Sequence, residues 1–286
     1  MDRAATLPCF DNPTDISRLD GGITNVNLTV RDGDQRYVVR LGDDIPEHGV
    51  LRWNELALSK AAELAGISPA VVHHESGVLV LAFIEASTLS EADVRDPANL
   101  PKIIDLVGKA HRQLGAHLTQ PVLAFWPFQV NRNYAARLAL DGSSHRSKLP
   151  ALMSAQEALE AATGQIDMVI GHNDLLAANI LDDGKRLWLI DWEYGGFNTP
   201  LFDLAGLAGN NDLSDAQERA MLEQYFDAPA DARWRPYQAM KCVSLMRETL
   251  WSMTSEIHSY LEFDYAAYTA ENMSRLEAAL ADFRNA

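Results

Sequence analysis

The first hundred residues show the apolar patterns of β-strands, with one helix between them. Residues 23–41 hold two β-rich runs on either side of the polar stretch RDGDQ, which predicts a hairpin. Residues 70–76 and 78–84 predict a second pair of strands. Residues 50–65 instead place apolar side chains at helical spacing, and Gly66 ends that helix. The pattern therefore predicts a small lobe that is rich in strands.

Helical spacing dominates from about residue 90 onward. Apolar residues recur every three or four positions in six segments, at 97–118, 129–140, 147–163, 214–226, 232–257 and 264–284. Ser214 and Gln217 are placed as a capping box at the start of one of them. We therefore predict an α+β protein of two lobes, residues 1–84 and 85–286, with a hinge at about residues 82–88. Ligand sites favour the cleft between two such lobes.

One segment between these helices combines strand-like runs with tight turns. Residues 171–196 read GHNDLLAANILDDGKRLWLIDWEYGG, in which a short strand runs into a bend and a hairpin with an Asp-Asp-Gly turn follows. The returning strand of the hairpin ends at Asp191, which brings Asp191 back toward Asn179. Three oxygen-bearing side chains, Asp174, Asn179 and Asp191, therefore converge at one end of a small sheet.

This set of side chains has a definite chemistry. A carboxylate and an amide oxygen suit Mg²⁺, which takes one or two protein ligands and completes its shell with phosphate oxygens and water. A further carboxylate can accept the proton of an attacking hydroxyl, as in phosphoryl transfer. Asp and Asn also cap turns, and for any one of these residues that is the simpler interpretation. The complete pattern H-x-D-x-x-x-x-N, followed by a strand that ends in I-D, indicates phosphoryl transfer.

The same motifs resemble the choline/ethanolamine kinase branch of the aminoglycoside phosphotransferase superfamily, whose members are relatives of protein kinases. HNDLLAANIL and LIDWEYGG carry the strongest part of the resemblance, and PLFDLAGLAGNN continues it. LDGGITNVNLTV resembles the turn that covers the nucleotide in that branch. YVVRL resembles the strand that carries the positively charged side chain, here Arg40, that contacts the phosphates. The resemblance spans nearly the whole chain. It implies a two-lobed, protein-kinase-like fold with ATP and Mg²⁺ as cofactors.

The resemblance also implies roles for the residues of the quoted segment. Asp174 would be the catalytic base that orients and deprotonates the substrate hydroxyl. Asn179 and Asp191 would hold Mg²⁺. We expect His172 to be structural and to hold the catalytic loop by hydrogen bonds rather than to take protons.

An ATP site is implied in the smaller lobe. Arg40, paired with Glu55 of the following helix, would contact the ATP phosphates as a fixed positive charge. The other residues expected to bind ATP are Gly22, Thr24 and Asn25 of the covering turn, together with Phe83 and Ile84 at the hinge.

Aromatic and acidic side chains indicate where the acceptor substrate binds, because a quaternary ammonium is recognised by aromatic faces with a carboxylate nearby. The candidates are Trp192, Glu193, Glu248 and Trp251. Eukaryotic choline kinases carry two tryptophans three residues apart in the corresponding helix. This chain has Glu248 at the first position and Trp251 at the second, which favours an amine that donates hydrogen bonds, such as ethanolamine or another amino alcohol. Two alternatives stay open: Trp251 packs in the core, or Arg247 stacks on it.

Composition narrows the class of partner. The formal net charge is −16, from 24 basic and 40 acidic residues, which argues against a nucleic-acid partner and permits a cationic substrate. Cys9 and Cys242 lie far apart without a partner pattern, as expected in a reducing compartment without a cysteine metal site. The longest apolar run, residues 78–84, is too short for membrane insertion, and the N-terminus lacks a secretory pattern. We expect a cytoplasmic protein.

The sequence thus predicts an ATP-dependent small-molecule kinase that phosphorylates an amino alcohol such as choline or ethanolamine. One alternative is a kinase for another alcohol acceptor, such as an aminoglycoside, thiamine or a sugar. A second alternative is a nucleotide-binding pseudokinase or regulatory module, against which the joint presence of Asp174, Asn179 and Asp191 speaks. The oligomeric state stays open, and a homodimer is one alternative.

Overall fold

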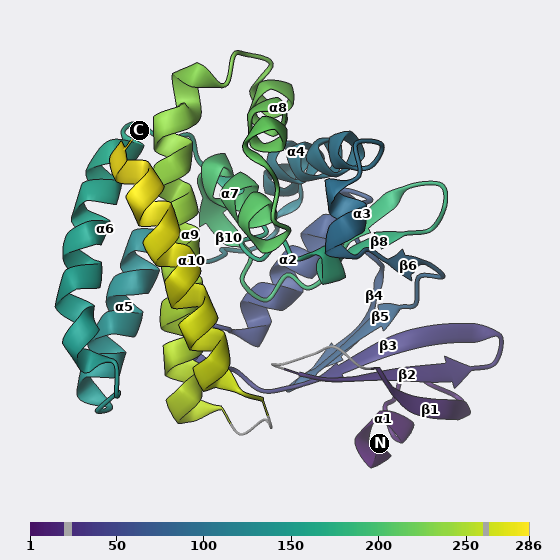
Figure 1. Ribbon diagram of the computed structural model, residues 1–286. Helices are drawn as coiled ribbons and strands as arrows, with labels where there is room; N and C mark the ends of the chain where they lie inside the picture. The colour runs from purple at the N-terminus through teal and green to yellow at the C-terminus, as the bar shows by residue number, and fades with distance from the viewer. Residues whose placement is uncertain (20–24, 260–262, 286) are drawn as a thin grey trace.

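The computed structural model describes residues 1–19, 25–259 and 263–285. An antiparallel sheet lies at one end of the molecule, and a group of long helices, α5, α6, α9 and α10, lies at the opposite side (Figure 1). Helix α2 lies between these two parts. The arrangement confirms the predicted α+β class. The lobe boundary at residues 84/85 stays a prediction.

The N-terminal sheet has five strands in the order β1-β2-β3-β5-β4. Its strands are β1 (Pro13–Leu19), β2 (Val26–Asp32), β3 (Gln35–Leu41), β4 (Val71–Glu75) and β5 (Val78–Ala82). Both predicted strand pairs are present, as β2 with β3 and β4 with β5. The sequence pattern did not reveal β1, since most of its side chains face solvent and show no apolar alternation.

Helix α2 (Arg52–Leu64) belongs to the main core although it lies within the N-terminal part of the chain. Leu58 and Ala61 are buried in the same apolar cluster as the helices of the larger lobe. The sheet has a separate small cluster, in which Leu28, Val39 and Val80 pack with the short helix α1 (Asp2–Ala5). The chain leaves α2 through Gly66, whose φ of +66° suits glycine, as the sequence predicted.

The larger lobe contains the predicted helices and two that the pattern missed. Its helices are α3 (Glu91–Arg95), α4 (Leu100–His117), α5 (Pro127–Leu140), α6 (Leu149–Thr163), α7 (Pro200–Asn210), α8 (Asp215–Phe226), α9 (Asp231–His258) and α10 (Tyr265–Asn285). The capping box predicted for Ser214 and Gln217 is formed at the start of α8. Helix α7 was missed because it is buried on nearly all sides, so its sequence lacks a polar face with helical period.

Short strands frame the segment that carries the motifs. Strand β7 (Val169–Gly171) pairs with β10 (Gly196–Asn198). Strand β8 (Ile180–Asp182) forms the predicted hairpin with β9 (Leu187–Leu189) and also pairs with β6 (Ser87–Thr88), at the end of the predicted hinge segment. These pairings hold the motif loops against the connection between the lobes. Among helices in the described ranges, none is both long and apolar enough to cross a membrane.

Candidate active site

The loop between β7 and β8 is held by a buried carboxylate at the start of α7. Asp203 accepts hydrogen bonds from the backbone N–H groups of His172 and Asn173, both at 2.7 Å, and from His111 Nε2 at 2.8 Å. Burial alone would raise the pKa of Asp203, but the hydrogen bond and charge of His111 outweigh it and lower that pKa. Asn173 takes a φ of +65°, and this strained residue directly precedes Asp174.

His172 packs behind this loop. Its Nε2 donates to the carbonyl of Ile190 at 2.8 Å, and its ring lies 4.7 Å from the ring of Trp192. Burial lowers the pKa of His172 and so favours the neutral ring. The contact ties the catalytic loop to the strand that returns to Asp191, which agrees with the structural role predicted for His172.

Asp174 lies at the open end of the loop, with its side chain 20% exposed. Its nearest cation is Arg247, whose Nη1 lies 3.8 Å from Asp174 Oδ1. Burial raises the pKa of Asp174 to about 8; Arg247 opposes this shift, and the carboxylates of Glu248 and Asp191 reinforce it. An Asp with a raised pKa next to a cation is typical of a functional carboxylate.

Asn179 and Asp191 come together as the hairpin predicted. The N–H of Ile190 donates to the carbonyl of Asn179 at 3.0 Å, so Asp191 is adjacent. The side-chain nitrogen of Asn179 donates to the Asp174 carbonyl at 3.0 Å, which leaves the amide oxygen as the atom that a metal would use. Asp191 has a φ of +68°, a second strained position at the site.

These donors fit Mg²⁺. One carboxylate and one amide oxygen are hard ligands, and the remaining positions of Mg²⁺ are ordinarily filled by phosphate and water. Within residues 1–19, 25–259 and 263–285, no three His, Cys, Asp or Glu side chains form a protein-only metal cage. Mg²⁺ does not need such a cage.

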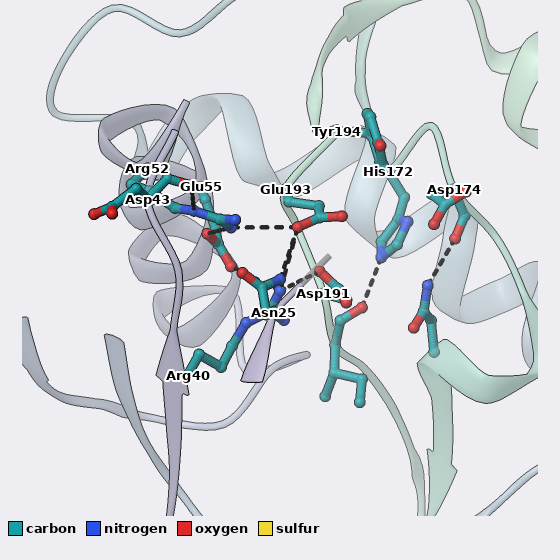
Figure 2. A network of polar contacts seen from close by, with 12 residues as sticks. Asn25, Arg40, Asp43, Arg52, Glu55, His172, Asp174, Asp191, Glu193 and Tyr194 are labelled. Carbon is teal, nitrogen blue, oxygen red and sulfur yellow. Dashed lines mark hydrogen bonds and ion pairs between the residues drawn. The ribbon is translucent and has the colours of Figure 1, made fainter. Parts of the chain in front are cut away.

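A network of ion pairs joins the two lobes beside the metal ligands (Figure 2). Arg40 on β3 lies 3.2 Å from Glu55 on α2, which is the predicted pair, and donates to Asp191 Oδ1 at 2.8 Å. Burial would lower the pKa of Arg40, but Asp191, Glu55 and Glu193 outweigh it and raise that pKa. The same contact with Arg40 holds the pKa of Asp191 below its ordinary value against the effect of burial.

Glu193 is the acceptor at the centre of this network. Its Oε2 receives Asn25 Nδ2 at 3.0 Å, Arg52 Nη1 at 3.3 Å and Arg40 Nη2 at 3.5 Å. These donors come from the N-terminal part of the chain, whereas Glu193 follows β9. Burial and the neighbouring Asp191 raise the pKa of Glu193 to about 7. The predicted substrate residue Glu193 is thus placed at the junction of the lobes, beside Arg40, the residue predicted to contact ATP phosphates.

The remaining residues predicted to bind ATP fall into two groups. Gly22 and Thr24 lie outside the described residues. Phe83 and Ile84 are half-buried in the extended connection between β5 and β6, and Arg36 lies over the Phe83 ring at 3.7 Å. This connection falls within residues 82–88, where the hinge is predicted, and the hinge itself stays a prediction.

The predicted substrate residues are not all brought together. Trp192 is buried, and its indole N–H donates to Ser68 Oγ at 2.8 Å, so we assign it to the packing between the lobes and leave it out of the substrate site. Glu248 on α9 shares Arg247 with Asp174, and Trp251 on the same helix contacts Tyr194, whose ring Arg247 covers. Trp251 is 4% exposed and donates to the Tyr194 hydroxyl at 3.0 Å.

Three functional positions were missed from the sequence alone. Arg52 donates to Glu55 Oε2 at 2.7 Å, and its i,i+3 spacing from Glu55 is a signal that a helix pattern contains. Asp203 lies within the quoted PLFDLAGLAGNN, but nothing local shows that it holds the catalytic loop. Gly195 packs closely between the lobes, since a Cβ there would lie 2.5 Å from the Cδ1 atom of Leu58 on α2 and would force that side chain to shift.

Comparison with known proteins identifies the family. Residues 16–208 match the family model described as choline/ethanolamine kinase. The chain belongs to the choline/ethanolamine kinase family. It is therefore a small-molecule kinase, a phosphotransferase with an alcohol group as acceptor.

Individual relatives cover most of the chain. Protein LicA of Haemophilus influenzae is 27% identical over 271 residues, which cover 91% of this chain and 77% of the relative. A probable ethanolamine kinase of Arabidopsis thaliana is 26% identical over 291 residues, covering 90% and 77%. The crystal structure of a choline/ethanolamine kinase family protein from Mesorhizobium loti superposes with a TM-score of 0.77 at 25% identity, covering 100% and 99%. The two-lobed kinase-like fold is confirmed.

Proposed function

We propose that this protein is an ATP-dependent kinase that transfers the γ-phosphate to the hydroxyl of an amino alcohol such as choline or ethanolamine. The observation that carries the proposal is the convergence of Asp174, Asn179 and Asp191 on one loop and hairpin, facing the Arg40–Glu55 pair of the other lobe. Phosphoryl transfer requires a base, ligands for the metal and a cation that contacts the phosphates.

Each residue has a defined task in this proposal. Asp174 orients the acceptor hydroxyl and takes its proton. Asn179 and Asp191 hold Mg²⁺, which supplies positive charge to the phosphates when bound. Arg40 contacts the phosphates and is held by Glu55, whose side chain is 3% exposed.

Phe83, Ile84 and Asn25 complete the part of the ATP site that the structure describes. Phe83 and Ile84 supply backbone groups and apolar contact for the base of the nucleotide. Gly22 and Thr24, which the sequence also predicts to bind ATP, lie outside the described residues. Asn25 already donates to Glu193, which lies beside the phosphate-contacting Arg40.

An amine-bearing acceptor is favoured by the charges near Asp174. Asp174 and Glu248 are two carboxylates that share one nearby cation, Arg247. Because burial raises the pKa of Asp174 to about 8, this cluster gains a net negative charge only when Asp174 loses its proton, and an arriving ammonium would favour that ionised form. The aminoglycoside, thiamine and sugar alternatives and the pseudokinase alternative are separated by the experiment below.

The test is ADP release with ATP and Mg²⁺ across a panel of choline, ethanolamine, thiamine, aminoglycosides and simple sugars. We expect turnover with an amino alcohol and background rates with sugars. Turnover with another class alone would identify a different acceptor, and no turnover with any acceptor, together with ATP binding, would favour the pseudokinase.

A further inference from the structure

Arg247 is the cation that, among the residues the structure describes, pairs with the predicted base Asp174. It lies on α9 with its side chain 5% exposed. Its Nη1 donates to Glu248 Oε2 at 2.8 Å and lies 3.8 Å from Asp174 Oδ1. Its guanidinium carbon lies 4.3 Å from the centroid of the Tyr194 ring and 5.9 Å from that of Phe125. Arg247 is therefore an internal cation on an aromatic face, between two carboxylates.

This is the environment that an organic cation would otherwise occupy. A quaternary ammonium binds to the faces of aromatic rings within about 6 Å of the centroid, with carboxylates nearby. Here the Tyr194 face is already covered by Arg247. Trp251 offers no free face in its place, since its ring packs 5.1 Å from His48 and meets Tyr265 and Tyr268 edge-on.

Glu248 can still accept hydrogen bonds from a ligand, whereas the Tyr194 ring face is already covered. Its Oε2 accepts from Arg247, and its Oε1 accepts from the Tyr268 hydroxyl at 2.8 Å. Each carboxylate oxygen has about two lone pairs, so each can accept one more directed hydrogen bond. A primary or secondary ammonium can donate such bonds, whereas a quaternary ammonium has no N–H to donate.

We infer that Arg247 is the residue that determines acceptor specificity, because it occupies the aromatic face that a quaternary ammonium would need. The protein therefore prefers a primary or secondary amino alcohol over its fully methylated counterpart. This inference rests on the proposed function and refines its substrate class.

A second ligand chemistry is conceivable at the same residue. Among the described residues, Arg247 Nε and Nη2 have no hydrogen-bond acceptor, which an acceptor molecule with a carboxylate or phosphate would supply. However, both nitrogens are closed to solvent and the guanidinium lies over the Tyr194 ring. An anionic acceptor would reach them only if the side chain moved, so the structure favours the specificity role.

The test uses a series that changes only the number of methyl groups: ethanolamine, N-methylethanolamine, N,N-dimethylethanolamine and choline. We expect the kcat/KM of the unaltered protein to decrease along the series, with the largest step at choline. Arg247→Met keeps the side-chain length and removes the charge. It should raise the choline-to-ethanolamine ratio of kcat/KM by roughly 2- to 30-fold, the range of one cation–π contact. Arg247→Lys keeps the charge and should keep the order of preference.

Two further variants keep the test decisive. Arg247→Met leaves Glu248 without its partner, so Arg247→Met/Glu248→Gln is measured beside it, and all melting temperatures are recorded. An unchanged choline-to-ethanolamine ratio in folded Arg247→Met protein overturns the inference while the kinase proposal stands. A lower melting temperature with equal loss for every acceptor also overturns it, since it indicates a structural role.

The failure of the proposed function has a different signature. If the unaltered protein phosphorylates none of the four amines, the amino-alcohol proposal fails and the specificity inference fails with it. If it phosphorylates only hydroxy acids, and Arg247→Met abolishes that activity, then Arg247 binds an anionic acceptor and both statements are replaced.

Discussion

The two ends of the active site both bury arginines among carboxylates, but they do so in different ways. On the nucleotide side, Arg40 and Arg52 face Glu55, Asp191 and Glu193, and these five groups come from β3, α2 and the turn after β9. On the acceptor side, Arg247 faces its sequence neighbour Glu248 and the loop residue Asp174.

This difference indicates two functions for similar charges. The network around Arg40 and Glu193 crosses between the lobes, so we expect phosphates and metal to compete for its members. The cluster around Arg247 is held by one helix and one loop of the larger lobe, so we expect it to stay unchanged when ATP binds. Under the proposed function, ionic groups of the first kind would act on ATP binding, and those of the second kind would act on the choice of acceptor.

The largest expected effect is a loss of kcat when the predicted base, Asp174, is removed. Asp174→Ala should lower kcat by about 10²–10⁴-fold, because a positioned general base is lost. ATP binding should persist, since the contacts of Arg40 and Asp191 are untouched. Steady-state kinetics and nucleotide titration measure the two quantities. Glu271→Gln, an exposed change on α10, is the matched control. Near-normal kcat in Asp174→Ala would show that Asp174 is not the base.

The second prediction concerns the metal. Asp191→Ala removes a hard oxygen ligand, so Mg²⁺-dependent ATP binding should weaken strongly. It also frees Arg40 from its 2.8 Å contact, so metal-free ATP binding should stay equal or become tighter. Calorimetric titrations with and without Mg²⁺ distinguish the two effects. Equal weakening under both conditions would contradict a metal-binding role for Asp191.

The third prediction tests whether the cross-lobe network acts as a unit. Arg52→Met and Glu193→Gln should each raise the KM for ATP, and the double variant should show a coupling energy of about 0.5–3 kcal/mol. The exposed pair Arg31–Asp15, whose charged atoms lie 3.2 Å apart, is the control. Its contribution to the free energy of unfolding should be about 1 kcal/mol or less. Additive effects of Arg52→Met and Glu193→Gln would mean that the two side chains act independently.

The smallest effect is a pH dependence of stability on the acceptor side. Burial, with the charge of Arg247, lowers the pKa of His48 to about 3 in the folded chain, against about 6.5 in an unfolded one. The folded state therefore binds fewer protons, and the stability that neutral His48 contributes is lost as pH falls from about 6.5 toward 3. Between pH 7 and pH 4, His48→Gln should lose less melting temperature than the unaltered protein, by on the order of a few degrees. If the melting temperatures of the two proteins changed equally with pH, this contribution of His48 would be excluded.

Local patterns predicted much of the fold. The β2–β3 and β4–β5 pairs, helix α2 with its stop at Gly66, and the amphipathic helices of the larger lobe all appear where apolar spacing placed them. Helix α7 was not predicted, because a helix buried on nearly every side has no amphipathic period. Strand β1 was not predicted, because most of its side chains face solvent.

In the candidate site too, residues close together in the sequence were predicted, whereas the surroundings supplied by distant elements were not. Asp174, Asn179 and Asp191 lie within one short segment, so hairpin geometry was sufficient to bring them together. Glu248 and Trp251 were placed on one helix by spacing, but spacing did not set what surrounds them. Arg247 was weighed as a partner that stacks on Trp251, and the structure instead places it on the Tyr194 ring.

The sequence by itself thus determined that Asp174, Asn179 and Asp191 lie together, because short-range spacing and hairpin geometry bring them to one end of a small sheet. The roles of base, metal ligands and phosphate-contacting pair are implied by the family resemblance and stay predictions. Only the tertiary structure decided which groups face one another across the site. Glu193 receives donors that lie 141 to 168 residues away along the chain, and Arg247 meets Asp174 from a different element. Such contacts depend on how the two lobes pack, because the direction of a long side chain is set by its neighbours in space and not by its neighbours in sequence.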